Sequence, residues 1–151
     1  MPIILETRKS LFDLVEMSKY TADNWPADLW PNFSFAEMAC QETGECNMDM
    51  QFMGLLQSLR NEVGRPMKIT SGYRSPRHSI EAAKTTLGSH AMGRAVDIAC
   101  AGEEAMDILE GALWLGFTGV GVAQKGKNRF LHLDNLDSGE HTANRPAIWS
   151  Y

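Results

Sequence analysis

The segment GSHAMGRAVD, residues 88–97, places a histidine and an aspartate, His90 and Asp97, seven residues apart. A glycine stands on either side of the histidine, and glycine allows the tight backbone conformations that turn two such side chains toward one point. Residues 96–99 are apolar and β-branched around Asp97, so we expect this aspartate to lie on a strand inside a sheet. The rest of the chain is organised around this segment.

A second fragment, FLHLD at residues 130–134, adds His132 and Asp134. Side chains alternate along a strand, so this histidine and aspartate project from one face and the two leucines from the other. Together, His90, Asp97 and His132 make a nitrogen and oxygen donor set that suits zinc, with a fourth position left open for water.

A single histidine or strand aspartate is more often a hydrogen-bonded structural residue than a metal ligand. The joint presence of the two fragments favours a metal site here. A closed structural zinc site generally uses four ligands, whereas a catalytic site keeps three protein ligands and one water. Because three ligands are evident, the sequence favours a hydrolytic zinc over a structural one.

The composition bounds the class of protein. The 151 residues, 44% hydrophobic and 22% charged, suit one globular domain. The formal net charge of −5 argues against nucleic acid and anionic membranes, which need a basic surface. The sequence has no apolar run of transmembrane length, and its first residues do not resemble a signal peptide. We therefore expect synthesis in a cytoplasm, no nucleic-acid partner, no membrane partner and a monomer.

The three cysteines, Cys40, Cys46 and Cys100, are an odd number and make no disulfide framework. We expect buried or free thiols in a reducing compartment. A pairing of Cys40 with Cys46, or a second metal shared between them, is the alternative.

Hydrophobic periodicity predicts two long helices. The first runs from about Asp49 to Val63 and ends before Gly64, and the second runs from Glu103 to Leu115 and ends at Gly116. A capping box at residues 34–37 opens a short helix before them. The apolar face of the second long helix is expected to carry Met106, Leu109 and Leu113.

Strand patterns occupy residues 67–73, 96–99, 117–123 and 129–136, and a turn at 125–128 joins the last two into a hairpin. Residues 79–88 are expected to be a polar connection, and the aromatic tail is expected to dock on the body. Because helices and strands mix without regular βα alternation, the fold class is α+β, with a small antiparallel sheet packed against helices.

Residues 1–32 are interpreted as an N-terminal extension that packs on a body formed by residues 33–151. A short amphipathic helix is expected over residues 10–20. Trp25 and Trp30 either clamp this extension onto the body or form an exposed contact patch, and the clamp is the commoner arrangement.

The motif Ser89-x-His90-x2-Gly93-x-Ala95-x-Asp97, followed by His132-x-Asp134, resembles one zinc peptidase family. This family includes D-Ala-D-Ala carboxypeptidases and L-Ala-D-Glu peptidases and shares its fold with the hedgehog signalling domain. The segment SGYRS at 71–75 also matches its pattern, and the likeness covers about residues 33–151. The phage-encoded members are the most similar, since they too end in R-P-x-x-W-S-Y, here residues 145–151.

The resemblance implies Zn²⁺ on His90, Asp97 and His132. It also implies that Arg74 binds or polarises the substrate, where a fixed cationic donor would stabilise developing negative charge. Ser89 is expected to contact the substrate, although it could instead cap the turn that holds His90.

The general base is where this sequence departs from many relatives. The positions two and three residues before the last ligand hold Phe130 and Arg129, and neither accepts a proton from water. Asp134 is the expected base, with orientation of His132 as its alternative role. Asp137 and His141 are further candidates in the following loop.

These observations predict a zinc metallopeptidase that hydrolyses a peptide bond in bacterial peptidoglycan. The expected substrate is a stem peptide or a cross-bridge, cut in the manner of a carboxypeptidase or of a phage endolysin. The phage virion or the host cell during lysis is the expected place of action. The alternative is a non-catalytic virion or cell-wall binding module that retains the peptidase fold.

Overall fold

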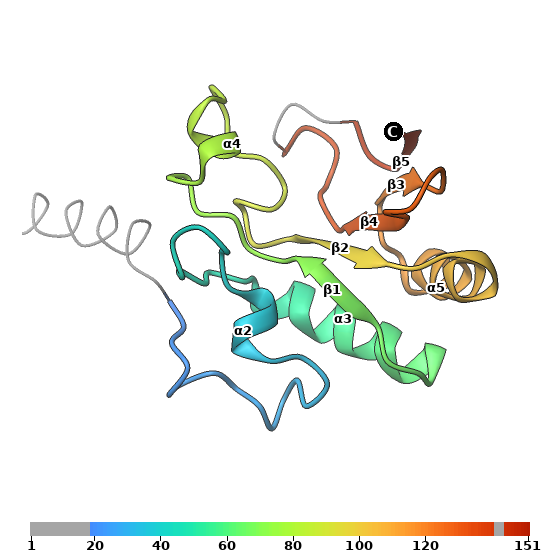
Figure 1. Ribbon diagram of the computed structural model, residues 1–151, viewed down its shortest axis with the longest axis horizontal. Helices are drawn as coiled ribbons and strands as arrows, with labels where there is room; N and C mark the ends of the chain where they lie inside the picture. Colours follow the sequence, from blue (N-terminus) through green and yellow to red (C-terminus); the bar gives the residue numbers. More distant parts are fainter. Residues whose placement is uncertain (1–18, 141–143) are drawn as a thin grey trace, which may run out of the picture.

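The computed structural model describes residues 19–140 and 144–151 (Figure 1). Helices and strands are interleaved along the chain, and five strands form one sheet. The elements are α2 (Phe35–Met38), α3 (Met50–Val63), β1 (Lys68–Ser71), α4 (Ser79–Ala82), β2 (Ala95–Ala99), α5 (Gly102–Leu115), β3 (Gly119–Ala123), β4 (Phe130–Asp134) and β5 (Ala147–Ser150).

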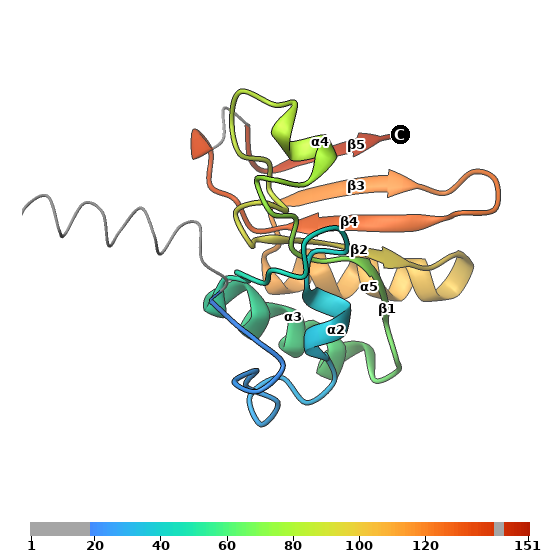
Figure 2. The same ribbon diagram turned by 60° about the vertical axis from the view of Figure 1, so that its left-hand side comes forward.

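The strand order in the sheet is β1-β2-β4-β3-β5. All neighbouring strands are antiparallel except β3 and β5. Because β4 returns antiparallel to β3 and the chain reverses once more before β5, the last strand runs in the direction of β3. The expected α+β class is confirmed, and the expected docking of the tail takes the form of this parallel edge strand (Figure 2).

The two faces of the sheet have different chemistry. Val96 and Ile98 of β2, with Leu131 and Leu133 of β4, are buried in the main hydrophobic core. The alternate residues of the same strands project from the opposite face and include the histidine and the aspartates of the two sequence fragments. Helices α3 and α5 lie together beside the core (Figure 1), so the polar residues face away from the helices.

Both long helices begin and end as their sequences predict. The Asp49 side chain caps α3 by accepting a hydrogen bond from the Phe52 N–H at 2.9 Å. Gly64 ends this helix with a left-handed backbone, φ 74°, and Gly116 ends α5 with φ 89°.

Two of the three residues expected on the apolar face of α5 are exposed, and only Leu109 packs against the core. Met106 and Leu113 are 66% and 59% exposed, and the fully or nearly buried side of the helix carries Ala105, Ile108 and Ala112. The reason is close packing against α3, where a Cβ added at Gly111 would lie 2.8 Å from Leu59 Cδ1. Small residues allow this approach, and Met106 and Leu113 are left outside.

The polar connection expected over residues 79–88 contains a helix that the sequence patterns missed. Helix α4 is only four residues long, and His78 caps it by accepting a hydrogen bond from the Ile80 N–H at 3.1 Å. A single helical turn is too short to show an apolar periodicity.

Residues 19–32 pack against the body. Trp30 is 2% exposed, and its ring centroid lies 5.0 Å from that of Trp25. The Tyr20 N–H donates to the Cys46 carbonyl at 3.0 Å, and the Trp25 indole donates to the Phe33 carbonyl at 2.8 Å. The helix expected over 10–20 falls almost wholly outside the described residues, and the division at residue 32 stays a prediction.

All three cysteines are buried, and none of them forms a disulfide, as the first interpretation of their number predicts. Within residues 19–140 and 144–151, no helix has the length and apolarity needed to cross a membrane.

Candidate metal centre

Two of the three expected ligands are cross-strand neighbours. Asp97 of β2 lies opposite His132 of β4 in the antiparallel register, so both side chains project from the same face. Ser71 of β1 lies opposite Asp97, and Gly121 of β3 lies opposite His132. The ligands therefore lie on the inner strands of the sheet, where backbone pairing on both sides fixes their positions.

The third ligand, His90, comes from the loop before β2. Gly93 gives this loop its turn, with φ +71°, and a Cβ there would lie 2.1 Å from the Asn47 carbonyl oxygen. The Gly93 carbonyl accepts a hydrogen bond from the Asp49 N–H at 2.9 Å, which ties the loop to the start of α3. The tight loop expected from the sequence is thus built mainly on Gly93.

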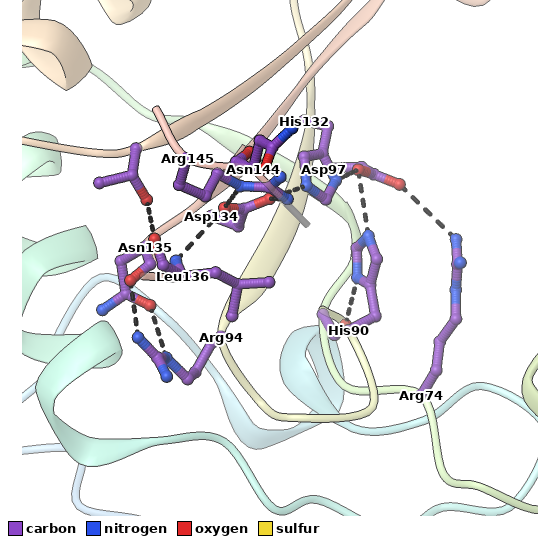
Figure 3. A network of polar contacts seen from close by, with 12 residues as sticks. Arg74, His90, Arg94, Asp97, His132, Asp134, Asn135, Leu136, Asn144 and Arg145 are labelled. Atoms are coloured by element: carbon purple, nitrogen blue, oxygen red, sulfur yellow. Dashed lines mark hydrogen bonds and ion pairs between the residues drawn. The ribbon is translucent and has the colours of Figure 1, made fainter. Parts of the chain in front are cut away.

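The three side chains converge. Asp97 Oδ1 lies 3.1 Å from His132 Nδ1 and 3.3 Å from His90 Nε2, as Figure 3 shows. One donor atom from each residue lies within 4.8 Å of the others. His90 and His132 are 5% and 4% exposed, so the group is buried and could hold a single metal ion.

The ring nitrogens of His90 and His132 that point away from Asp97 form hydrogen bonds that support metal binding. His90 Nδ1 lies 2.8 Å from the Gly72 carbonyl, which only accepts, so this nitrogen carries the proton and Nε2 keeps its lone pair. His132 Nε2 lies 2.8 Å from Asp134 Oδ2, which leaves Nδ1 to face Asp97. In the neutral form of both rings, the nitrogen that faces the carboxylate therefore keeps its lone pair, and this donor set fits a zinc ion.

Asp134 is held by an arginine that the sequence analysis gave no role. Arg145 donates through Nε to Oδ1 and through Nη2 to Oδ2, each at 2.9 Å, and the Leu136 N–H donates to Oδ1 at 3.3 Å. Asp134 is completely buried. Burial alone would raise the pKa of this carboxyl, but the hydrogen bonds from His132 and Arg145 outweigh it and lower the pKa to about 2.

The same balance acts on the ligands. Burial opposes ionisation of Asp97, yet its contacts with His132 and His90 hold its pKa well below the usual range. Burial also opposes protonation of His132, but Asp134 and Asp97 together raise the pKa of this imidazole. Without a metal, positive charge on His132 is therefore stabilised by two neighbouring carboxylates.

Arg74 lies at the edge of the group. Its Nη2 is 3.7 Å from Asp97 Oδ2, and its backbone N–H donates to the His90 carbonyl at 3.2 Å. The side chain is partly exposed, so the guanidinium remains available to a ligand. Ser89 is also partly buried and lies beside His90.

Two hollows of about 320 and 310 Å³ meet at Arg74 and Asp97, which line both. We call them the Trp149 hollow and the Gln41 hollow. The Trp149 hollow is further lined by Lys84, Ser89, His90, Phe130, His132, Arg145, Trp149 and Tyr151. The Gln41 hollow is further lined by Gln41, Thr70, Ser71, Gly72, Tyr73, His78 and Ile80. A larger hollow of about 710 Å³ lies between α3 and α5 and includes none of the candidate ligands.

Of the two further candidates for the base, one lies among the described residues. Asp137 is exposed in the loop after β4, and His141 is outside the described residues. His78 lines the Gln41 hollow, and its Nε2 lies 2.8 Å from Glu42 Oε2.

A family model described as Peptidase M15 matches residues 31–134. The chain belongs to the peptidase M15 family. The match covers most of the chain and includes all three candidate ligands, Arg74 and Ser89. M15 membership supports a metallopeptidase, and the family's dependence on zinc agrees with the buried donor set. No curated protein matches this M15 chain.

Proposed function

We propose that this chain is a zinc-dependent peptidase that hydrolyses a peptide bond in bacterial peptidoglycan. The observation that carries the proposal is the buried group of His90, Asp97 and His132 inside the region matched by the M15 family. The outer hydrogen bonds of both rings add to it, because they leave the two lone pairs that zinc needs.

Each residue has a role that follows from its contacts. His90, Asp97 and His132 would hold the ion, which supplies a Lewis acid for the carbonyl and lowers the pKa of a coordinated water. Arg74 is the cationic donor that faces the carbonyl oxygen or a substrate carboxylate. By analogy with oxyanion-hole donors, such a group contributes about 3–4 kcal/mol to the transition state.

The role of Asp134 as general base stays a prediction. Its contacts support the alternative role, because both of its oxygens are engaged by Arg145 and one of them also faces His132 Nε2. A buried carboxylate with a pKa near 2 is a weak proton acceptor at neutral pH. We therefore assign Asp134 to the orientation of His132.

The two hollows support cleavage within a peptide rather than at its end. Arg74 and Asp97 stand between the hollows, so a peptide could extend into both from a bond placed beside the metal group. A stem peptide or a cross-bridge has this extended form. We propose an internal bond of peptidoglycan as the substrate, and host-wall lysis or entry by a phage as the setting.

Mass spectrometry of muropeptides after incubation with the zinc-loaded protein tests this function. We expect new fragments that differ by hydrolysis of one internal peptide bond, and none with His132→Ala, because that substitution removes a ligand. Trp114→Ala is the control, since Trp114 is 82% exposed on α5 and away from the candidate ligands. Full turnover by His132→Ala would contradict the assignment.

One observation favours the second candidate, a binding module with little catalysis. Asp97 is the only carboxylate among the described residues that line the Trp149 hollow, and it is itself a ligand candidate. Bound zinc, retention on purified cell walls and no fragments would favour the binding module over the peptidase.

A further inference from the structure

We propose that Arg145 is a positioning residue of the metal centre, which holds Asp134 against the Nε2 edge of His132 and so keeps Nδ1 turned toward Asp97. The inference rests on the proposed function, because it assigns zinc to the ligand group. It extends that function to the C-terminal segment 144–151, which the family match at residues 31–134 does not include.

The contacts of Arg145 fix the position of the Asp134 carboxylate. Its guanidinium forms a bidentate pair with Asp134, through Nε to Oδ1 and Nη2 to Oδ2, both at 2.9 Å. The arginine side chain is 10% exposed and the aspartate is not exposed at all. Two parallel hydrogen bonds between a guanidinium and a carboxylate fix the orientation of the carboxylate as well as its distance. Figure 3 shows Asp134 between the guanidinium and His132.

Two glycines of β3 make room for this support. Gly119 lies opposite Asp134 in the register, and a Cβ there would come within 2.2–2.4 Å of its carboxylate. Gly121 lies opposite His132 on one side and Trp149 on the other, and a Cβ there would lie 2.7 Å from Trp149 Nε1. The carboxylate and the indole therefore lie over β3 only because these positions lack side chains.

The Trp149 ring packs against the Arg145 guanidinium. The Arg145 guanidinium lies 5.2 Å from the Trp149 ring centroid, within cation–π range. The same indole lies 5.2 Å from the His132 ring. The C-terminal segment 144–151 thus supplies both the arginine, just before β5, and the ring packed against it, on β5. Pairing of β5 with β3 therefore places both residues beside His132.

The test measures zinc affinity of the folded proteins by competition with a chromophoric chelator. We expect Arg145→Gln to weaken zinc binding by about 10- to 100-fold, the usual effect of losing a partner that orients a ligand. Arg145→Lys keeps the positive charge but cannot form the bidentate pair, so its zinc affinity should lie between those of Arg145→Gln and the natural chain. Arg129→Gln, an exposed arginine beside β4, is the matched control and should leave zinc affinity unchanged.

A double-mutant cycle distinguishes positioning from general loss of structure. If Arg145 acts through Asp134, adding Arg145→Gln to Asp134→Asn should change zinc affinity by less than about twofold. In proton NMR of the metal-free protein, the hydrogen-bonded Nε2–H of His132 should give a protected downfield resonance that Arg145→Gln removes. This second measurement needs no zinc.

The following results would overturn the proposed role of Arg145. Arg145→Gln that binds zinc within twofold of the natural chain and keeps the Nε2–H resonance overturns the inference, as do additive effects in the cycle. If Arg145→Gln does not fold, Arg145→Lys takes its place, and unchanged zinc affinity and resonance in that variant overturn the inference. A natural chain that binds no zinc contradicts the proposed function, whereas the NMR comparison still judges the role of Arg145.

Discussion

Asp97 Oδ1 is shared by both imidazoles, at 3.1 Å from His132 and 3.3 Å from His90. One oxygen thus lies between the two imidazole nitrogens, and the other faces Arg74. In the absence of metal, the neighbouring carboxylates of Asp97 and Asp134 raise the pKa of His132 and so favour its protonated form. A zinc ion would replace this proton by a stronger positive charge.

Zinc binding should therefore release a proton from His132 at pH 6.5 and below. The raised pKa keeps the ring protonated near its model-peptide value of about 6.5, whereas metal binding needs the neutral form. Apparent zinc affinity should rise with pH and level off once the pH exceeds the pKa of His132. Calorimetry in buffers of different ionisation enthalpy measures this, and we expect about one proton per zinc from this ring.

The stability of the metal-free protein changes with pH in the opposite direction to the zinc affinity: it falls as the pH rises. A raised pKa in the folded state stabilises the metal-free protein fully below the unfolded pKa, and this contribution is lost as pH rises through the folded value. Zinc binding without proton release at pH 6.5 would contradict the charge balance described for His132.

Among the elements, α5 shows where a sequence pattern and a packed helix differ. The buried side of α5 is made largely of small residues, with Ile108 as the large one, because the helix approaches α3 closely at Gly111. Hydrophobic periodicity weights large apolar side chains and so selects Met106 and Leu113, which are exposed. The bounds of the helix depend on local capping and are predicted well, whereas its rotation depends on its partner.

Two substitutions in α5 test this rotation. Ile108→Ala should lower the free energy of unfolding by about 2–5 kcal/mol, because it leaves a cavity in the core. Met106→Ala should change it by no more than about 0.5 kcal/mol, since that side chain is 66% exposed. Urea unfolding of both variants gives the comparison. A larger loss for Met106→Ala would restore the face expected from the sequence.

For the whole molecule, the sequence predicts the ligands and misses their support. His132 and Asp97 stand in short fragments whose alternation is a local property, so their common face follows from the chain itself. Arg145 meets Asp134 only after β5 has docked beside β3, and that contact depends on tertiary structure. The signal was present in the tail motif R-P-x-x-W-S-Y, but no spacing rule links it to β4.

The ligands also come from parts of the chain that only folding unites. Asp97 lies on β2, His132 on β4, and His90 on a loop tied to the start of α3. Unfolding separates them, so the unfolded chain should bind zinc far more weakly than the folded one. If the chain binds zinc at these residues as proposed, we expect zinc affinity and stability to be coupled through the whole fold.

This coupling predicts the effect of zinc on thermal unfolding. At free zinc 100-fold above the dissociation constant, the folded state gains about 2.7 kcal/mol. For a chain of this length that corresponds to a rise in Tm of roughly 5–11 °C. Differential scanning calorimetry with and without a chelator measures it. His132→Ala should show no such rise because one ligand is gone, and an equal rise in that variant would mean that zinc binds elsewhere on the chain.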